Sequence, residues 1–338
     1  MNIALICFSD TGSKLAVRLR DELKPESVCV HSIEKYARSY GFMAHASVSA
    51  DMQALFSQYD ALIFLCACGI AVRQIAPYVK NKTEDPAVLV IDDAGQYVIP
   101  ILSGHLGGAN VLARRVALLI GAVPVITTAT DVAGRFSCDA WAAEHGCAVS
   151  SMPLAKEISA AILTRDVPIT SDYPLPTVLP DGLKRDDSGE LGMYIGVRTA
   201  EPFEKTLRMI PRIITIGVGC RRGTPEETIR SVIDTVLTEH RIDPRSVCRI
   251  ASIDVKRDEA GLLACAEEMG VPAVFFTAAE LIDVPGNFEQ SAFVQQTVGV
   301  DNVCERAAVC AGGSLLVRKT ALNGVTVAAG IEDWSVAF

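Results

Sequence analysis

Residues 3–23 read IALICFSDTGSKLAVRLRDEL, and this pattern indicates the fold class. An uninterrupted apolar run ends at the turn-forming residues Ser9-Asp10-Thr11-Gly12. Leu15, Leu19 and Leu23 then follow at the spacing of one helix face. The stretch predicts a buried strand, a short loop and an amphipathic helix.

The same unit recurs along the first third of the chain. Apolar runs at Ala61–Ala67 and Ala87–Ile91 predict strands, and a helical pattern over Leu106–Ile120 precedes another strand pattern at Val123–Thr127. Continuous apolar strands that alternate with helices predict a mostly parallel sheet covered on both faces. We therefore expect a first α/β domain over residues 1–135.

The pattern restarts in the second half of the chain. A strand is predicted at Arg212–Val218 and a helix at Pro225–Glu239. Thr224 would be the N-cap of this helix, and Glu227 follows three residues later, which is the spacing of a capping box. Further strands are predicted at Val247–Ser252, Ala273–Phe276, Ser314–Val317 and Val325–Ala328. We expect a second α/β domain over residues 211–338.

The segment between these domains, residues 136–210, is predicted to be less regular. Residues 164–201 are rich in Pro, Asp and Gly, although a helix is predicted at Met152–Leu163. A chain of 338 residues also fits two domains of roughly 150 residues better than one. The expected fold is two α/β domains with mostly parallel sheets, joined by a less regular middle segment.

Composition and charge narrow the classes of partner. Half of the residues are hydrophobic and 21% are charged, so the chain has enough apolar surface for real cores and is not of a disordered type. The net charge of −9 argues against binding to nucleic acid or to an anionic membrane surface, because both need a positive field. Small molecules are the favoured partners, and the oligomeric state is not predicted.

The cysteines and the uncharged runs indicate a cytoplasmic protein. Eleven cysteines, an odd number, are scattered singly, and no Cys-x-x-Cys pair occurs, so neither a disulfide framework nor a protein-bound metal is expected. The longest uncharged run, Val116–Thr130, is interrupted by Gly121 and Pro124 and is too short to span a membrane. The N-terminus lacks the features of a signal peptide and reads directly as a strand.

A first glycine-rich loop, residues 103–110, reads SGHLGGAN and leads from a strand pattern at Tyr97–Leu102 into a helix. Glycines let a ligand approach the backbone, and free amide groups at a helix start attract anions. The loop matches neither a phosphate loop nor a dinucleotide fingerprint, so nucleotide binding is not supported. The substrate-binding residues predicted here are Ser103, Gly104, Gly107, Gly108 and Asn110.

His105 lies inside this loop. An imidazole at this position could act as a general acid or base near neutral pH. It could equally cap the helix or fill a core, because no partner is visible in the sequence. Both interpretations stay open at this point.

A second loop, Gly217–Gly223, lies between a strand and a helix, where open α/β sheets bind ligands. Arg221 and Arg222 could grip carboxylates there, next to Gly219, or could simply be solvated on a surface turn. Cys220 could be a nucleophile if its pKa were lowered, or it could be a small buried cysteine at a strand end.

Other polar or glycine positions are candidate substrate-binding or catalytic residues. Most stand at or just after a predicted strand end, Arg73 lies on the helix that begins at Gly69, and Glu305 is a lone acid in a fairly apolar stretch. Each has an ordinary alternative as a helix cap, a surface ion pair or a solvated side chain. They are Gly69, Arg73, Thr128, Asp131, Lys256 and Glu305.

The ordered set of motifs resembles the CbiG family of cobalamin biosynthesis. The N-terminal part of that family is matched at Gly69–Arg73, Ile75–Pro77, Lys82, Asp85–Val88, Leu102–Asn110 and Pro124–Asp131. Its C-terminal domain is matched at Gly217–Thr224, Ala251–Lys256, Glu259–Leu262, Ser291–Val294, Gly299–Glu305 and Lys319. The resemblance covers nearly the whole chain and is weakest over residues 164–201.

The resemblance implies a cobalt-precorrin-5A hydrolase of the anaerobic pathway. Members of this family open a δ-lactone between a ring A acetate and the methylated meso carbon with water, and release that carbon as acetaldehyde to give cobalt-precorrin-5B. Cobalt is carried by the substrate, so no cofactor is expected. The product would be handed over to other enzymes of the pathway.

The resemblance also suggests roles for the candidate residues. His105 is the favoured catalytic residue, and Glu305 and Asp131 are rival bases. Arg73 and the second loop with Arg221 and Arg222 would bind substrate carboxylates. The two loops are then expected to face each other across a cleft between the domains.

Two other functions remain possible from the sequence. A non-catalytic corrinoid or tetrapyrrole carrier would use both loops to hold the macrocycle and would break no bond. A generic α/β hydrolytic or methyl-transfer enzyme would act on another substrate, but the chain has no Gly-x-Ser-x-Gly elbow of a serine hydrolase.

Overall fold

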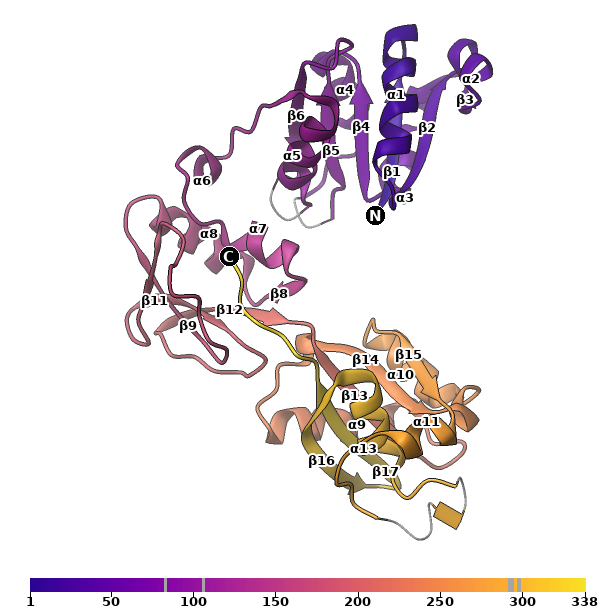
Figure 1. Cartoon of the computed structure of the whole chain (residues 1–338), viewed down its shortest axis with the longest axis vertical. Coiled ribbons are helices and arrows are strands. Elements are labelled where there is room, and N and C mark those ends of the chain that lie inside the picture. Colours follow the sequence, from indigo (N-terminus) through magenta and orange to yellow (C-terminus); the bar gives the residue numbers. More distant parts are fainter. Residues whose placement is uncertain (82–83, 105–106, 291–294, 297–298) are drawn as a thin grey trace. The chain divides into compact units, whose positions relative to one another are not determined.

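The computed structural model describes residues 1–338 except 82–83, 105–106, 291–294 and 297–298 (Figure 1). The chain packs as two compact units. Unit 1 comprises residues 1–144 and 162–164, and unit 2 comprises residues 145–161 and 165–338. The predicted division into residues 1–135, 136–210 and 211–338 stays a prediction. The α/β fold class with mostly parallel sheets is confirmed.

Unit 1 contains a seven-stranded sheet of order β3-β2-β1-β4-β5-β6-β7. Its strands are β1 (Asn2–Cys7), β2 (Ser27–Ile33), β3 (Met43–His45), β4 (Ala61–Leu65), β5 (Ala87–Ile91), β6 (Tyr97–Leu102) and β7 (Val123–Pro124). The first five strands are parallel, β6 is antiparallel to β5, and β7 is parallel to β6. One strand reversal therefore interrupts the predicted parallel sheet.

Helices cover both faces of this sheet, as the continuous apolar strands predict. Helices α1 (Asp10–Glu22) and α5 (Ala109–Ile120) cover one face, α3 (Val48–Gln58) and α4 (Cys68–Ile75) cover the other, and α2 (Glu34–Tyr40) packs on β2 and β3. Helices α6 (Ala129–Val132) and α7 (Cys138–Glu144) follow β7 in the chain. Leu5 packs with Leu19 of α1 and Leu112 of α5, whereas its neighbour Ile6 packs with Met52 of α3. Successive strand residues point to opposite faces, which is why every residue of such a strand is apolar.

The reversal of β6 decides where the first glycine-rich loop lies. Leu102 pairs with Val88 near the start of β5, and Val98 pairs with Ile91 at its end. The loop that follows Leu102 therefore lies at the end of the sheet where β5 begins, that is, at the amino end of the parallel strands. Gly69 follows the opposite, carboxyl end of β4, at the start of α4.

The middle of the chain contains a five-stranded sheet of order β10-β9-β11-β12-β8. Its elements are β8 (Cys147–Val149), α8 (Met152–Ile162), β9 (Val167–Ser171), β10 (Leu183–Arg185), β11 (Leu191–Ile195) and β12 (Lys205–Pro211). The sequence pattern predicts no strand in this segment, whereas the structure has five short strands joined by irregular connections. Within unit 2, Arg208 of β12 forms a 3.1 Å ion pair with the buried Asp243.

The C-terminal sheet has the order β15-β14-β13-β17-β16. Its strands are β13 (Ile214–Cys220), β14 (Val247–Ile253), β15 (Ala273–Phe276), β16 (Ser314–Leu322) and β17 (Val325–Ile331). Its helices are α9 (Glu226–Glu239), α10 (Ala260–Glu268), α11 (Ala278–Asp283) and α13 (Val303–Gly312), with short 3-10 turns at Pro244–Ser246 and Asp254–Lys256. The strands β13, β14 and β15 are parallel, and β17 is antiparallel to β13.

Helix α13 packs unusually close to β13 and β17 because glycines face it. A Cβ atom at Gly217 would lie 1.9 Å from the carbonyl oxygen of Cys304, and one at Gly330 would lie 2.3 Å from that of Ala308. No side chain fits at either position without moving the helix. The glycines therefore fix the distance between α13 and the sheet.

The predicted capping box at α9 is wrong. Pro225 is the N-cap, in extended conformation, and no side chain caps the helix. The Thr224 hydroxyl instead donates a 2.8 Å hydrogen bond to the carbonyl of Arg221, so it closes the preceding turn. A capping box does occur at α11, where Thr277 and Glu280 bond reciprocally.

Two smaller differences concern unit 1. Helix α5 begins at Ala109, after Gly108 with φ 77°, rather than at the predicted Leu106, which lies outside the described residues. The strand predicted at Val123–Thr127 is restricted to Val123–Pro124. No helix in the described parts of the chain is long and apolar enough to cross a membrane.

Candidate functional site

A cavity of about 690 Å³ opens in unit 2 where β13 and β14 end. This is the crevice position at which open α/β sheets bind ligands. The cavity is lined by residues of the second predicted loop, 219–222, and of five other ranges: 252–253, 255–256, 301–304, 319 and 321–326. The predicted residues Gly219, Cys220, Arg221, Arg222 and Lys256 all lie here, and their contact with a ligand stays a prediction.

The hairpin between β16 and β17 forms one wall of the cavity. Asn323 and Gly324 both have positive φ, 52° and 79°, as expected for an Asn-Gly hairpin turn of type I′. Leu322, next to this turn, and Val255, after β14, are 42% and 50% exposed while they line the cavity. Apolar side chains therefore reach solvent at the mouth of the cavity.

Lys256 is held by an internal carboxylate. Its Nζ lies 3.0 Å from Oε2 of Glu259, and the other oxygen of Glu259 accepts a 2.7 Å hydrogen bond from the amide of Gly223. Glu259 is only 3% exposed. Burial raises its pKa, but the bonds from Lys256 and Gly223 outweigh this, so the pKa of Glu259 lies below its ordinary value.

Two further cations at the cavity are also paired. Arg222 binds Asp258 at 3.1 Å and donates to the carbonyl of Val255 at 3.2 Å. The Nζ of Lys319 lies 2.5 Å from Oε1 of Glu289. By contrast, the Arg221 guanidinium makes no ion pair or hydrogen bond with any described residue.

Cys220 is partly buried, and its thiol lacks the lowered pKa that would activate it as a nucleophile. Burial raises the pKa of its thiol above the ordinary value, Lys256 lowers it only in part, and Glu259 raises it further. Cys304, which also lines the cavity, has its pKa raised to about 12 by burial. Both thiols therefore stay protonated near neutral pH.

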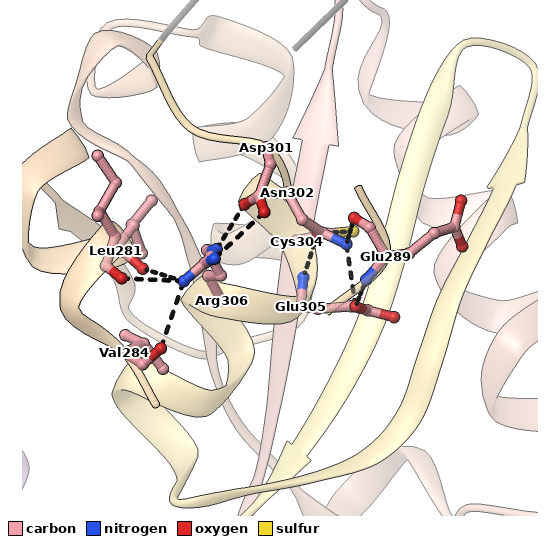
Figure 2. Close-up of polar contacts among 9 residues, drawn as sticks. Leu281, Val284, Glu289, Asp301, Asn302, Cys304, Glu305 and Arg306 are labelled. Atoms are coloured by element: carbon pink, nitrogen blue, oxygen red, sulfur yellow. Dashed lines mark hydrogen bonds and ion pairs between the residues drawn. The ribbon is translucent and has the colours of Figure 1, made fainter. Parts of the chain in front are cut away.

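Glu305 is not among the described residues that line the cavity. Figure 2 shows its fully buried carboxylate at the start of α13. One oxygen accepts 2.9 Å hydrogen bonds from the Glu289 amide and the Asn302 side chain, and the other accepts a 2.8 Å bond from the Lys319 amide. Asn302 in turn caps the helix by accepting from the Glu305 amide at 3.0 Å. The carboxylate thus joins two segments of the cavity wall, at Asn302 and Lys319, to the segment of Glu289.

Arg306 fixes the neighbouring segment (Figure 2). Its guanidinium binds both oxygens of Asp301, at 2.7 and 3.2 Å, and donates to the carbonyls of Leu281 and Val284 at 3.0 and 3.3 Å. Asp301 lines the cavity, so Arg306 supports its wall from behind. Sequence reasoning missed this cluster. The cap pattern Asn302-x-x-Glu305 was a usable signal for the helix start.

In unit 1, close packing shapes the first glycine-rich loop. The Ser103 hydroxyl donates a 2.9 Å hydrogen bond to the carbonyl of Asp85. A Cβ atom at Gly107 would lie 2.4 Å from that of Ser103. The amides of Ala109 and Asn110 donate to the carbonyls of Ser103 and Gly104, so neither is available to an anion. His105, the favoured catalytic residue, lies outside the described residues.

Three predicted residues meet at the start of α5. The Asn110 side chain, only 3% exposed, donates to the Thr128 hydroxyl at 2.9 Å and to Oδ2 of Asp131 at 3.0 Å. Thr128 also donates to the same oxygen of Asp131. Arg114 of α5 binds the other oxygen at 2.7 Å. Both oxygens of Asp131 are therefore engaged.

Gly69 and Arg73 lie apart from the start of the first loop. Gly69 is at the start of α4, with open space where a Cβ atom would be. Arg73 is exposed on the same helix and bonds to no described residue. A hollow of about 430 Å³ does adjoin the first loop, and it is lined in part by Gly107, Asp85 and Lys80. Within the described residues, no group of His, Cys, Asp or Glu side chains could hold a metal ion.

Comparison with known proteins identifies the family. The family models for the N-terminal and C-terminal parts of cobalamin synthesis protein G match residues 50–131 and 214–330. The chain is also 35% identical to the cobalt-precorrin-5A hydrolase of Salmonella typhimurium, over 98% of this chain and 97% of that protein. The chain belongs to the CbiG family.

A second curated relative agrees with this assignment. The cobalt-precorrin-5A hydrolase of Priestia megaterium is 33% identical, over 83% of this chain and 81% of that one. A crystal structure of a cobalamin biosynthesis protein G homologue from Sulfolobus solfataricus is 24% identical, covers 98% of this chain and 97% of its own, and has a TM-score of 0.41. The two CbiG models include both predicted loops, one in each unit.

Proposed function

We propose that this CbiG protein is a cobalt-precorrin-5A hydrolase of cobalamin biosynthesis. The observation that carries the proposal is the 35% identity to the Salmonella typhimurium enzyme of that name over 98% of this chain. The proposed substrate is therefore an anionic tetrapyrrole intermediate. Its cobalt ion would enter with the substrate, so we propose no resident metal or cofactor, and its product would pass to another enzyme of the pathway.

The proposed reaction opens a lactone and then breaks a carbon-carbon bond. Water adds to the lactone carbonyl and the ring C–O bond breaks, which leaves a carboxylate and a hydroxyl group on the methylated meso carbon. The bond from this carbon to the macrocycle then breaks, and its electron pair stays with the macrocycle, which takes up a proton. The hydroxyl loses its proton, and the fragment leaves as acetaldehyde, so one water is consumed overall.

This chemistry needs a group that takes a proton from water and a donor that stabilises the oxyanion. We propose His105 as the base, because an imidazole can take up a proton near neutral pH. Among the described residues of the same loop, the Ser103 hydroxyl is bonded to the Asp85 carbonyl, and Gly107 packs on Ser103.

The contacts of the two rival bases, Asp131 and Glu305, favour a role in positioning segments of the chain over a role as the catalytic base. Asp131 already accepts from Asn110, Thr128 and Arg114, and so ties α5 to the segment after β7. Glu305 is fully buried and accepts three hydrogen bonds. A base must reach the water that it activates. We therefore propose positioning roles for both carboxylates.

The direct test is an oxygen-free incubation of the purified protein with cobalt-precorrin-5A. The expected result is one equivalent of acetaldehyde, trapped as its hydrazone. The tetrapyrrole product should have the mass of the substrate plus one water minus one acetaldehyde. A folded protein that binds the substrate and releases no acetaldehyde would show that the proposal is wrong.

Substitution of His105 tests the proposed base. His105→Ala should lower kcat by about 100-fold or more, the usual contribution of a general base, while the affinity for the tetrapyrrole changes little. His240→Ala, at the exposed end of α9, is the matched control and should retain full activity. Equal losses of turnover and affinity in His105→Ala would instead favour a binding role for this loop.

A further inference from the structure

The cavity in unit 2 combines an apolar interior with a charged rim. Ile253, Val303 and Val325 line it and are less than 9% exposed, whereas Val255 and Leu322 reach solvent at its mouth. Its volume of about 690 Å³ lies within the range of roughly 300–1,000 Å³ that small-molecule pockets occupy. An apolar, flat ligand edge fits these surroundings better than a fully hydrated one.

The charges on the rim leave one cation available. Lys256 is paired with Glu259, Lys319 with Glu289, and Arg222 with Asp258. The acid on the rim, Asp301, is paired with Arg306. Arg221 alone among the four basic residues lining the cavity has no such partner in the described chain.

Arg221 is placed at the mouth by the hairpin. A Cβ atom at Gly324 would lie 3.7 Å from both Cδ and Nε of Arg221, so the side chain runs along the turn between β16 and β17. The turn residue Asn323 and the neighbouring Leu322 also line the cavity. The guanidinium thus lies next to exposed apolar surface, which is the arrangement that an amphipathic ligand requires.

We propose that this cavity binds one edge of a corrinoid macrocycle, with its apolar ring inside and a single peripheral carboxylate on Arg221. That the ligand is a corrinoid rests on the proposed function. That one carboxylate binds at the rim follows from Arg221, the single cation there without a partner among the described residues. One uncompensated guanidinium can take one carboxylate through two parallel hydrogen bonds. A second carboxylate in the apolar interior would lack a counter-charge, which is costly. The cavity therefore selects an edge with one charge at its rim.

Two stable corrinoid probes separate the charge from the ring. Dicyanocobyrinic acid carries free peripheral carboxylates, and dicyanocobinamide has the same ring with amides in their place. Titration calorimetry on the full-length protein should show that cobyrinic acid binds more tightly. Arg221→Gln should weaken cobyrinic acid by about tenfold or more, the loss expected for a charge-assisted hydrogen bond, and should leave cobinamide affinity unchanged.

The matched control is Arg257→Gln. Arg257 is another exposed arginine near this rim that bonds to no described residue through its side chain and does not line the cavity. The substitution Arg257→Gln removes the same charge as Arg221→Gln and should leave the affinity for cobyrinic acid within about twofold of the wild type. Leu322→Glu adds an anion at the mouth and should weaken cobyrinic acid more than cobinamide.

The outcomes separate this inference from the proposed function. Equal binding of cobyrinic acid by wild type and Arg221→Gln, or equal losses in Arg221→Gln and Arg257→Gln, overturns the inference even if acetaldehyde is released. Arg221-dependent binding without acetaldehyde release supports the cavity assignment and contradicts the hydrolase proposal.

Discussion

Single side chains around the cavity divide into those that are free to meet a ligand and those that hold its walls. Arg221 belongs to the first group. Glu259 belongs to the second, because its two oxygens join Lys256 after β14 to the Gly223 amide after β13. An ion pair at this depth is significant for stability mainly because breaking it leaves a buried charge without a partner.

Glu259→Gln should therefore destabilise the protein in a pH-dependent way. At pH 7 the substitution is expected to lower the free energy of unfolding by about 1–3 kcal/mol. The folded-state pKa of Glu259 is lowered, so its contribution is complete above the ordinary glutamate pKa of about 4.3 and is lost as the pH falls through the lower folded value. Urea unfolding of both proteins from pH 7 down to pH 3.5 measures this. A difference that stays constant over that range contradicts the prediction.

At the scale of whole elements, the contact between α13 and the sheet is the feature most sensitive to the addition of a single carbon atom. Gly217 and Gly330 face the carbonyls of Cys304 and Ala308 with no room for a methyl group. The start of α13 carries Val303 and Cys304, which line the cavity. A change in the helix position would therefore reach the cavity directly.

Gly217→Ala should push α13 away from β13. The expected cost is about 1–3 kcal/mol of unfolding free energy, the usual range for an overpacked core. Gly69→Ala is a contrasting control, since a Cβ atom there meets nothing within 4 Å, and its effect should stay below about 1 kcal/mol. Chemical denaturation measures both. If Gly217→Ala is no more destabilising than Gly69→Ala, the close packing of α13 is not what the structure indicates.

Elements with short continuous apolar runs could be predicted from sequence, but their directions could not. The strands at Ala61–Leu65, Ala87–Ile91 and Ala273–Phe276 are found close to where the pattern predicts them. Periodicity is the same for either strand direction, so the reversal of β6 is invisible in Tyr97–Leu102. Only the pairing of the strands shows that Gly69 and the start of the first loop lie at opposite ends of the parallel strands.

The candidate site was predictable to a similar extent. The strand-end rule directs attention to the loop after β13, which lines a cavity, while its contact with a ligand stays a prediction. It cannot distinguish Arg221 from Arg222, because the partner of Arg222, Asp258, comes from a distant segment. The capping box at Thr224 failed for a local reason, since the Thr224 hydroxyl bonds to the carbonyl of Arg221 instead of capping α9.

The whole molecule is built from two units that each have their own core. Leu5 and Leu19 belong to the core of unit 1, and Ile216 and Ile229 to that of unit 2. The chain has two tryptophans. Trp141 is buried in unit 1, and Trp334 packs on Tyr173 in unit 2 at 4.9 Å between ring centroids. Each unit therefore carries its own fluorescent reporter.

The destabilisation caused by Leu5→Ala should be detected mainly by the fluorescence of Trp141. Removing this fully buried side chain is expected to cost about 2–5 kcal/mol in the unit that contains it. In single-tryptophan proteins made by Trp334→Phe or Trp141→Phe, the denaturation midpoint seen by Trp141 should fall further than that seen by Trp334. Equal shifts of the two signals would mean that the units unfold as one.

The tight contact of α13 with β13 has a consequence for the thermodynamics of binding. The helix cannot slide because Gly217 and Gly330 set its depth, and the turn at Gly223 is bonded to Glu259. The walls of the cavity are thus ordered during folding, before any ligand arrives. Binding then restricts few additional backbone and side-chain conformations, so little of the affinity is lost to conformational entropy. The cavity is therefore preorganised for the ligand that we propose, and loosening α13 should weaken that proposed binding without removing a ligand contact.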